Sequence, residues 1–262
     1  MTDILKYEAR KRLVGTLALG LGIGVFALLI VYIFPSIEVA GDSIQAYVEA
    51  LPEVFQEGFA IQSMTTIEGF LATEVYQFVW VLMLGLYLAY VAGGVVAGDV
   101  ETGRIDLLLA TPVSRKRVVV EKYLSLLSPI VVLNLLVPLF VYGATVVIDE
   151  PLDIVDFLAL HAFSVPYLLV TAAIGLGLSV VVERADFAQR GSLALIFALF
   201  VLDTVTASTD LEVLGVLSPT KYYAPGDILV DGTYDVAGAA ILLVAALILL
   251  VASAEWFQRT DV

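Results

Sequence analysis

Long apolar segments dominate this sequence and constrain its fold more than any other feature. A membrane-spanning helix needs about 20 consecutive, mostly apolar residues. Five segments meet this requirement: Leu13–Ile33, Phe78–Ala97, Leu124–Ile148, Leu158–Val182 and Val236–Ala254. A sixth, Leu193–Ala207, is shorter and contains Asp203, so it also fits a buried or re-entrant segment. Hydrophobic residues make up 60% of the chain, against about 45–50% in soluble domains. The sequence therefore predicts an all-α membrane protein, with residues 1–262 in a single transmembrane domain.

The positions of the basic residues indicate how the spans are oriented. Lys and Arg concentrate on the cytoplasmic side of membrane proteins. With six spans and a cytoplasmic N-terminus, 12 of the 13 basic residues fall on that side, and only Lys221 falls outside. Five spans would leave Arg259 outside, so the distribution favours counting Leu193–Ala207 as a span. We therefore expect six transmembrane helices with both termini cytoplasmic, in a multi-pass protein of the cell (plasma) membrane.

Charge and composition exclude several classes of function. The net charge of -14 disfavours nucleic acid as a partner. Such an acidic excess is also typical of proteins from high-salt environments, so we expect a halophilic source. The chain has no cysteine and one histidine, which excludes thiolate and histidine-based metal clusters. It contains no G-x-x-x-x-G-K-[ST] loop for ATP phosphates. We expect no catalytic site, metal or cofactor in this chain.

The predicted spans contain few polar side chains. An ion-coupled transporter buries ionisable residues within its spans because they must bind and release the coupling ion. His161 fits an interfacial hydrogen-bonding residue better than a ligand or a proton carrier. Asp203 is best interpreted as a carboxylate at a helix end or facing a loop. The alternative is a carboxylate that lines a cavity. We expect Asn134 to form a hydrogen bond between helices rather than to contact a substrate. The composition of the spans therefore disfavours an ion-coupled secondary transporter.

Small and rigid residues suggest where helices approach one another or bend. Two glycine pairs, Gly20-x-x-x-Gly24 and Gly94-x-x-x-Gly98, allow close helix packing, and each either marks a dimer face or packs within the chain. Proline removes a backbone donor and bends helices. Kinks, serving either as local adjustments or as gating hinges, are expected at three prolines: Pro129, Pro138 and Pro166.

Three segments outside the spans have amphipathic or interfacial character. The stretch Asp3–Arg12, which Asp3 can cap, fits an interfacial helix that leads into the first span, and equally a plain basic flank. Ser43–Gln62 fits an amphipathic helix interrupted by Pro52. Leu211–Leu217 fits a segment that dips back towards the membrane. The last two segments either cap an exit path or pack at the interface.

The loop between spans two and three is the most informative stretch of the sequence. Acidic residues open it, and a short helical run, Ile105–Ala110, is closed off by Pro112. Ser114 can cap a second helix whose basic face leads back into the membrane. A short helix with both apolar and charged groups on the membrane surface suits docking into a groove on a partner.

This loop resembles the signature of the ABC-2 family of ABC-transporter permeases. That signature runs acid, two residues, Gly, a small residue, aliphatic, acid, then Leu-Leu, a small residue, any residue, Pro, aliphatic, Ser or Thr, and Arg. The matching residues are Glu101, Gly103, Ile105, Asp106, Leu108, Leu109, Ala110, Pro112, Ser114 and Arg115, with Lys122 as a later basic match. Arg104 departs from the pattern, because Ser or Thr is usual there. The segments Gly69-Phe-Leu-Ala and 217–225 also resemble the family, so the resemblance covers nearly the whole chain.

The resemblance implies the membrane permease of an ATP-driven ABC transporter, with export more typical than import. It implies a coupling helix at Arg104–Ala110 that docks on a separate ATPase subunit, which carries the ATP and Mg²⁺. The predicted contact residues are Glu101, Gly103, Arg104, Ile105, Asp106, Leu108, Leu109, Pro112 and Arg115. A second, shorter contact is predicted at Glu183, Arg184, Asp186 and Arg190. A second permease copy, identical or similar, completes the implied assembly in the lipid bilayer.

Two other functions remain as alternatives. One is a membrane scaffold or assembly factor without a transport pathway, and the other is the ion-coupled secondary transporter that the spans disfavour. The candidate substrates include hydrophobic drugs, sodium, lipids, peptides, and copper- or sulfur-related cargo.

Overall fold

The structure, a computed structural model, describes residues 3–52, 56, 64–207 and 209–259. In this part of the chain it contains six helical segments that are long and apolar enough to cross a membrane, and no strand. The segments are α1 (Asp3–Val39), the composite segment Ile67–Glu101, the segment Arg115–Val147, α10 (Ile154–Val181), α11 (Ala185–Thr206) and α13 (Val236–Arg259). The predicted all-α fold with six spans is confirmed. Every span extends beyond its predicted apolar stretch at one end or both, because polar residues continue the helices.

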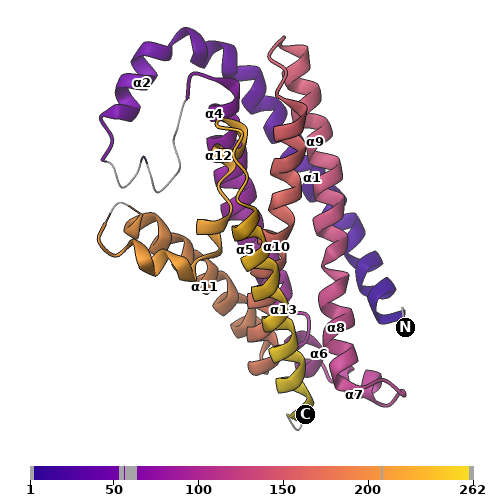
Figure 1. Ribbon diagram of the computed structural model, residues 1–262. Coiled ribbons are helices and arrows are strands. Elements are labelled where there is room, and N and C mark those ends of the chain that lie inside the picture. Colours follow the sequence, from indigo (N-terminus) through magenta and orange to yellow (C-terminus); the bar gives the residue numbers. More distant parts are fainter. Residues whose placement is uncertain (1–2, 53–55, 57–63, 208, 260–262) are drawn as a thin grey trace.

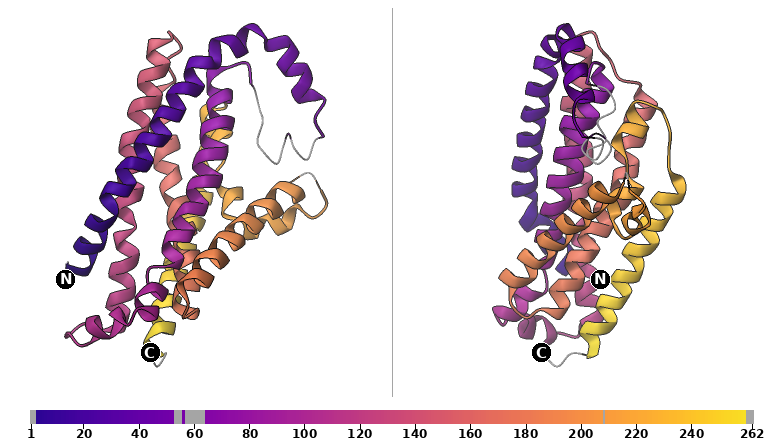
Figure 2. Two further views of the ribbon diagram at one scale, coloured as in Figure 1. Left: turned by 180° about the vertical axis from the view of Figure 1, so that it is seen from behind. Right: turned by 90° about the vertical axis from the view of Figure 1, so that its left-hand side faces the viewer.

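The helices form a long bundle in which α10 is the most buried span (Figure 1). It packs against α13 and against α5 (Gly85–Gly93), while α1 packs against α9 (Leu127–Val147). Both views show α11 leaning away from the bundle axis, in contact with α5 and α10 (Figures 1 and 2). The two described termini and the short helix α7 (Arg104–Leu109) lie towards one end, which we call the basal end (Figure 1). Helices α2 (Gly41–Glu49) and α4 (Ile67–Leu71) lie at the other.

Helix α1 is continuous from the N-terminal stretch through the first span. The stretch Asp3–Arg12 is helical, as expected, but no elbow separates it from the first span, since the helix runs unbroken to Val39; this agrees with the alternative of a plain basic flank. Gly20 and Gly24 face α9: a Cβ atom on Gly24 would lie 2.6 Å from Phe140 Cδ2, and one on Gly20 would lie 2.9 Å from Leu136 Cδ2. This glycine pair is used for close packing within the chain, not for a dimer face.

The second span changes its helical form along its length. It begins with α4, whose N-cap Thr66 accepts a hydrogen bond from Gly69 N at 3.2 Å. A π-helix, η1 (Ala72–Leu84), follows, and then α5. This π-helix was not predicted from the sequence; it is a rare form that is enriched at functional sites. Tyr167 Oη donates a hydrogen bond to the carbonyl oxygen of Val81 at 2.7 Å, so α10 satisfies a backbone group of this segment.

Close contact between the second span and α11 depends on two glycines. A Cβ atom on Gly93 would lie 2.6 Å from Ser192 Oγ, and one on Gly94 would lie 2.5 Å from Gln189 Nε2. A Cβ atom on Gly98 would lie 3.9 Å from the Ala185 side chain. The Gly94 and Gly98 pair therefore also packs within the chain. The helix breaks after Gly93 and resumes as α6 (Ala97–Glu101).

One of the three prolines coincides with a helix break. The segment Arg115–Val147 is divided into α8 (Arg115–Ser125) and α9 at Leu126. Pro129 lies four residues after Ser125, and a proline cannot donate to the carbonyl at that position and clashes with it. Pro138 and Pro166 lie inside continuous helices.

The segment between α11 and α13 folds back on the bundle. It contains two 3₁₀ helices, η2 (Glu212–Leu217) and η3 (Pro219–Tyr222), and then α12 (Pro225–Leu229). Figure 1 shows the turn between α11 and η2 partway along the bundle, well short of its upper end. Both 3₁₀ helices contact α11, so the segment Leu211–Leu217 packs against the bundle. Of the predicted amphipathic helix Ser43–Gln62, the part up to Glu49 is helical, and most of the rest lies outside the described residues.

Candidate functional site

The predicted coupling segment forms a short helix at the basal end. Gly103 precedes α7 with φ +67°, a left-handed conformation that glycine adopts without a Cβ clash. Helix α7 runs Arg104–Leu109, close to the predicted Ile105–Ala110, and ends before Pro112. Ser114 caps α8 by accepting a hydrogen bond from Arg117 N at 3.3 Å, as predicted. Local sequence signals therefore determine where α7 begins and ends.

Helix α7 has one buried side and one exposed side. Ile105 is 1% exposed and belongs to the hydrophobic core. Leu108 and Leu109 are half-buried and pack against that core. Leu107 is 73% exposed, and the predicted residues Asp106, Arg104 and Pro112 are exposed as well. Leu107 is not among the predicted contact residues, although its position two residues after Ile105 places it on the opposite face of a helix.

A groove separates α7 from the start of α1. It has a volume of about 540 Å³. We call it the basal groove, and it is lined by Asp3, Ile4, Tyr7, Glu8, Asp99, Arg104, Leu107, Leu108, Thr111 and Val113. Tyr7 stands on its α1 side and is 65% exposed, and Leu107 stands on its α7 side. The groove thus offers an apolar rim on both sides.

A group of charged side chains underlies this groove. Lys122 Nζ lies 2.6 Å from Asp99 Oδ2 and 3.2 Å from Glu8 Oε1. Arg104 Nη2 lies 2.9 Å from Asp99 Oδ1, and Arg12 Nη2 lies 3.0 Å from Glu8 Oε2. These five residues, which we call the Lys122 network, connect α1, α6, α7 and α8. Arg104, where the sequence departs from the family signature, is therefore an ion-pair partner within the chain.

The two predicted contact segments meet at the basal end. Glu101 Oε2 accepts a hydrogen bond from Ala185 N at 2.9 Å, which joins the end of α6 to the start of α11. Arg184 Nη2 pairs with Asp186 Oδ2 at 3.1 Å, and its guanidinium carbon lies 4.5 Å from the centre of the Phe187 ring. Glu183 and Arg190 are exposed. The structure thus brings together two segments that lie about 80 residues apart in the sequence.

Ser179 of α10 supports the break between α5 and α6. Its Oγ accepts hydrogen bonds from the backbone N–H groups of Val96 and Ala97, both at 3.0 Å. The first N–H groups of a helix have no partner within that helix. A side chain from another span therefore caps α6, and the sequence contains no local signal for it.

The polar residues inside the spans form a buried hydrogen-bonded group. His161 Nε2 lies 3.1 Å from Tyr76 Oη, and His161 Nδ1 lies 3.1 Å from Asn134 Oδ1. Ser164 Oγ donates to the same Asn134 oxygen at 3.0 Å. Asn134 thus joins α9 to α10, as predicted. His161 is a hydrogen-bonding residue, but it is 5% exposed and lies within the helix packing, not at the surface.

Asp203 faces the returning segment. Its Oδ2 accepts a hydrogen bond from Thr220 Oγ1 of η3, so it acts as the helix-end, loop-facing carboxylate that the sequence favoured. Nearby, Lys221 Nζ donates to Glu212 Oε1 at 2.6 Å. This hydrogen bond and the lysine charge lower the pKa of the exposed Glu212 carboxyl below its ordinary value. These contacts hold η2 and η3 against each other and against α11.

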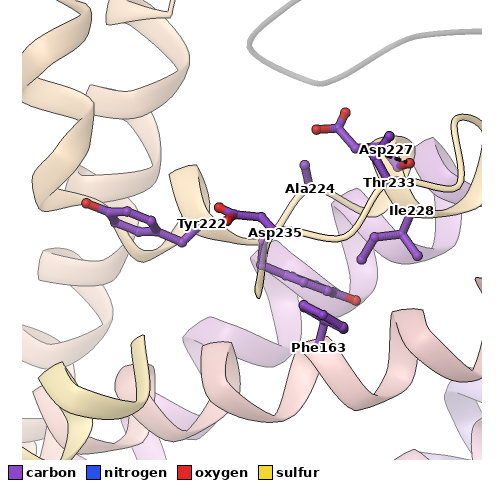
Figure 3. Close-up of a pocket in the computed structure, with 8 residues that line it drawn as sticks. Phe163, Tyr222, Ala224, Asp227, Ile228, Thr233 and Asp235 are labelled. Carbon is purple, nitrogen blue, oxygen red and sulfur yellow. Dashed lines mark hydrogen bonds between the residues drawn. The ribbon is translucent and has the colours of Figure 1, made fainter. Parts of the chain in front are cut away.

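A small cavity lies away from the basal end, between α10 and the returning segment. Figure 3 shows the residues that line it: Phe163, Tyr222, Tyr223, Ala224, Asp227, Ile228, Thr233 and Asp235. Its volume is about 50 Å³, too small for a drug-sized molecule. Over the described ranges, His, Asp and Glu side chains do not gather into a group that could hold a metal ion.

The six apolar helices define a multi-pass helical membrane protein, and the basal groove is its candidate partner site. The sequence model of the ABC-2 family transporter protein family matches residues 3–262. The chain belongs to this family, and the resemblance seen in the sequence is confirmed. It is a membrane permease of an ABC transporter. No curated protein matches it.

Proposed function

We propose that this chain is the permease subunit of an ATP-driven exporter in the cell (plasma) membrane. The basal end is cytoplasmic and faces a separate ATPase subunit, which binds and hydrolyses ATP with Mg²⁺. Two permease copies, identical or similar, sit on two ATPase subunits. Closure of the ATPase dimer on ATP pushes on α7 and shifts the spans between inward-open and outward-open states.

One observation carries this proposal, namely how α7 is held. Ile105 anchors one face of the helix in the hydrophobic core, and Arg104 binds Asp99 of the preceding helix. The opposite face presents Leu107 to solvent. A partner that grips Leu107 therefore acts on an element that is firmly connected to α1 and α8, and an applied displacement reaches the spans. Family membership supports the same conclusion.

A single charged substitution tests the docking role. Leu107→Asp puts a carboxylate into the expected contact, where desolvation without a partner is unfavourable. Because Leu107 is exposed, the fold should be unaffected. The measurement is co-purification with a co-expressed ABC ATPase subunit from the same organism, and the ATP hydrolysis of the complex in nanodiscs. We expect a loss of at least tenfold in association.

The matched control is Val39→Asp, since Val39 is also exposed, at 90%, and ends α1 next to α2, at the end opposite to the basal end. It should leave association unchanged. Equal association of the wild type and Leu107→Asp would overturn the docking role of α7. Absence of any association with an ATPase would favour the scaffold or assembly factor instead.

A further inference from the structure

Lys122 lies where three separate parts of the chain meet. It is in α8, its side chain is 1% exposed, and its two carboxylate partners come from α6 and α1. A buried ammonium group is costly unless it is paired and hydrogen-bonded. Asp99 and Glu8, each 8% exposed, meet that need. The burial of Lys122 therefore requires α1 and α6 to stay in place together.

The contacts of the two carboxylates extend this connection in both directions. Asp99 binds Lys122 through Oδ2 and Arg104 of α7 through Oδ1. Glu8 binds Lys122 through Oε1 and Arg12 through Oε2, and Arg12 Nη1 donates to Ser125 Oγ at 2.8 Å. A second contact joins α1 and α8, because Leu5 N donates to Glu121 Oε2 at 3.4 Å. Helix α7 is thus connected to the start of α1 through Asp99, Lys122 and Glu8.

The basal groove lies directly on this connection. Three members of the Lys122 network, Glu8, Asp99 and Arg104, line the groove, while Tyr7 and Leu107 stand exposed on its two sides. We propose that Lys122 holds the first turns of α1 and the α6–α7 segment together as one rigid unit, so that the ATPase docks on both sides of the basal groove. Lys122 acts as a positioning residue for this surface, and the proposal rests on the proposed function above.

The rigid unit has a direct test in the cysteine-free chain. Spin labels at Arg10→Cys on α1 and Thr111→Cys after α7 report the distance between the two sides by pulsed EPR in nanodiscs. Both positions are exposed. In the permease alone, Lys122→Met should broaden the distance distribution at least twofold. A distribution that stays as narrow as in the wild type would overturn the role of Lys122.

The matched control is Lys116→Met. Lys116 lies in the same helix, is 43% exposed and pairs with Glu255 of α13. Its loss should leave the distance between α1 and the α7 side unchanged. If Lys122→Met does not fold, the triple variant Lys122→Met, Glu8→Gln, Asp99→Asn removes the unpaired carboxylates. It should fold and show the same broadening, and a narrow distribution in it would again overturn the proposal.

Docking on both sides of the groove is tested by one substitution on each side, Leu107→Asp on α7 and Tyr7→Asp on α1. Tyr7→Asp should also weaken ATPase association at least fivefold, and no effect would exclude α1 from the docking surface. If no ATPase binds, the proposed function fails, whereas the EPR result still decides the role of Lys122.

Discussion

Removing the hydroxyl of Ser179 should destabilise the junction between the second span and the docking segment. Ser179 is 1% exposed, and its Oγ is the acceptor for the N–H groups of Val96 and Ala97. Ser179→Ala removes this one atom and leaves both donors buried, since Val96 and Ala97 are fully buried. The same two residues begin α6, which carries Asp99 and leads into α7. The substitution should therefore affect stability and coupling together.

The expected magnitude follows from the number of donors. A buried polar group that loses its partner costs about 1–3 kcal/mol, and two donors lose theirs here. Hydrogen bonds in membrane proteins average only about 0.6 kcal/mol in double-mutant cycles, because lost partners are replaced. A new acceptor for these two N–H groups is difficult to find at this site, because the surrounding residues are apolar and buried. We therefore expect a loss of about 2–4 kcal/mol in the free energy of unfolding.

Ser192→Ala provides the matched control. Ser192 is also fully buried, but its Oγ donates to the carbonyl oxygen of Ala188 in its own helix. Its loss leaves no backbone donor unpaired and should cost less than about 1 kcal/mol. The assay is unfolding of each purified variant in mixed micelles. Equal losses for the two variants, or a loss below about 1 kcal/mol for Ser179→Ala, would refute the reasoning.

Three further predictions concern topology, the buried polar group and energy coupling. Cysteines at Ser43 and Thr111 should label with a membrane-impermeant maleimide from opposite sides, and labelling of both from outside would contradict the six-span topology. Asn134→Leu should lower the free energy of unfolding by about 1–3 kcal/mol in mixed micelles, because the ring of His161 loses its side-chain partner on α9, whereas Ser164 keeps the carbonyl oxygen of His161 as an acceptor. An unchanged stability would show that the hydrogen bond between Asn134 and His161 is unimportant. Asp203→Asn should leave transport in vesicles intact with ATP and without an ion gradient, because the proposed function draws its energy from ATP alone. Gradient-driven flux in the wild type that vanishes in Asp203→Asn would instead support a secondary transporter.

The sequence by itself determined the features that depend on local composition. Apolar length located five of the six spans, because the bilayer requires about 20 apolar residues of each, and the distribution of Lys and Arg favoured the sixth. Backbone geometry and capping set where α7 begins and ends and where α8 begins, through Gly103, Pro112 and Ser114. These effects act over a few residues. The bounds of α7 were therefore predictable, as was the loop-facing role of Asp203.

Only the tertiary structure decided which residues those elements bring together. Glu8 and Lys122 lie 114 residues apart, and Val96 and Ser179 lie 83 apart. No periodicity or motif relates such positions, because these pairings depend on how α1, α8 and α10 pack. The same holds for Gly20 and Gly24, whose motif allows close packing but does not select the partner helix. The sequence shows that a charged side chain in a membrane segment needs a partner, because burying an unpaired charge is costly. It also shows that a small residue allows a neighbouring helix to approach closely. The identity of that partner follows from the three-dimensional arrangement of the spans.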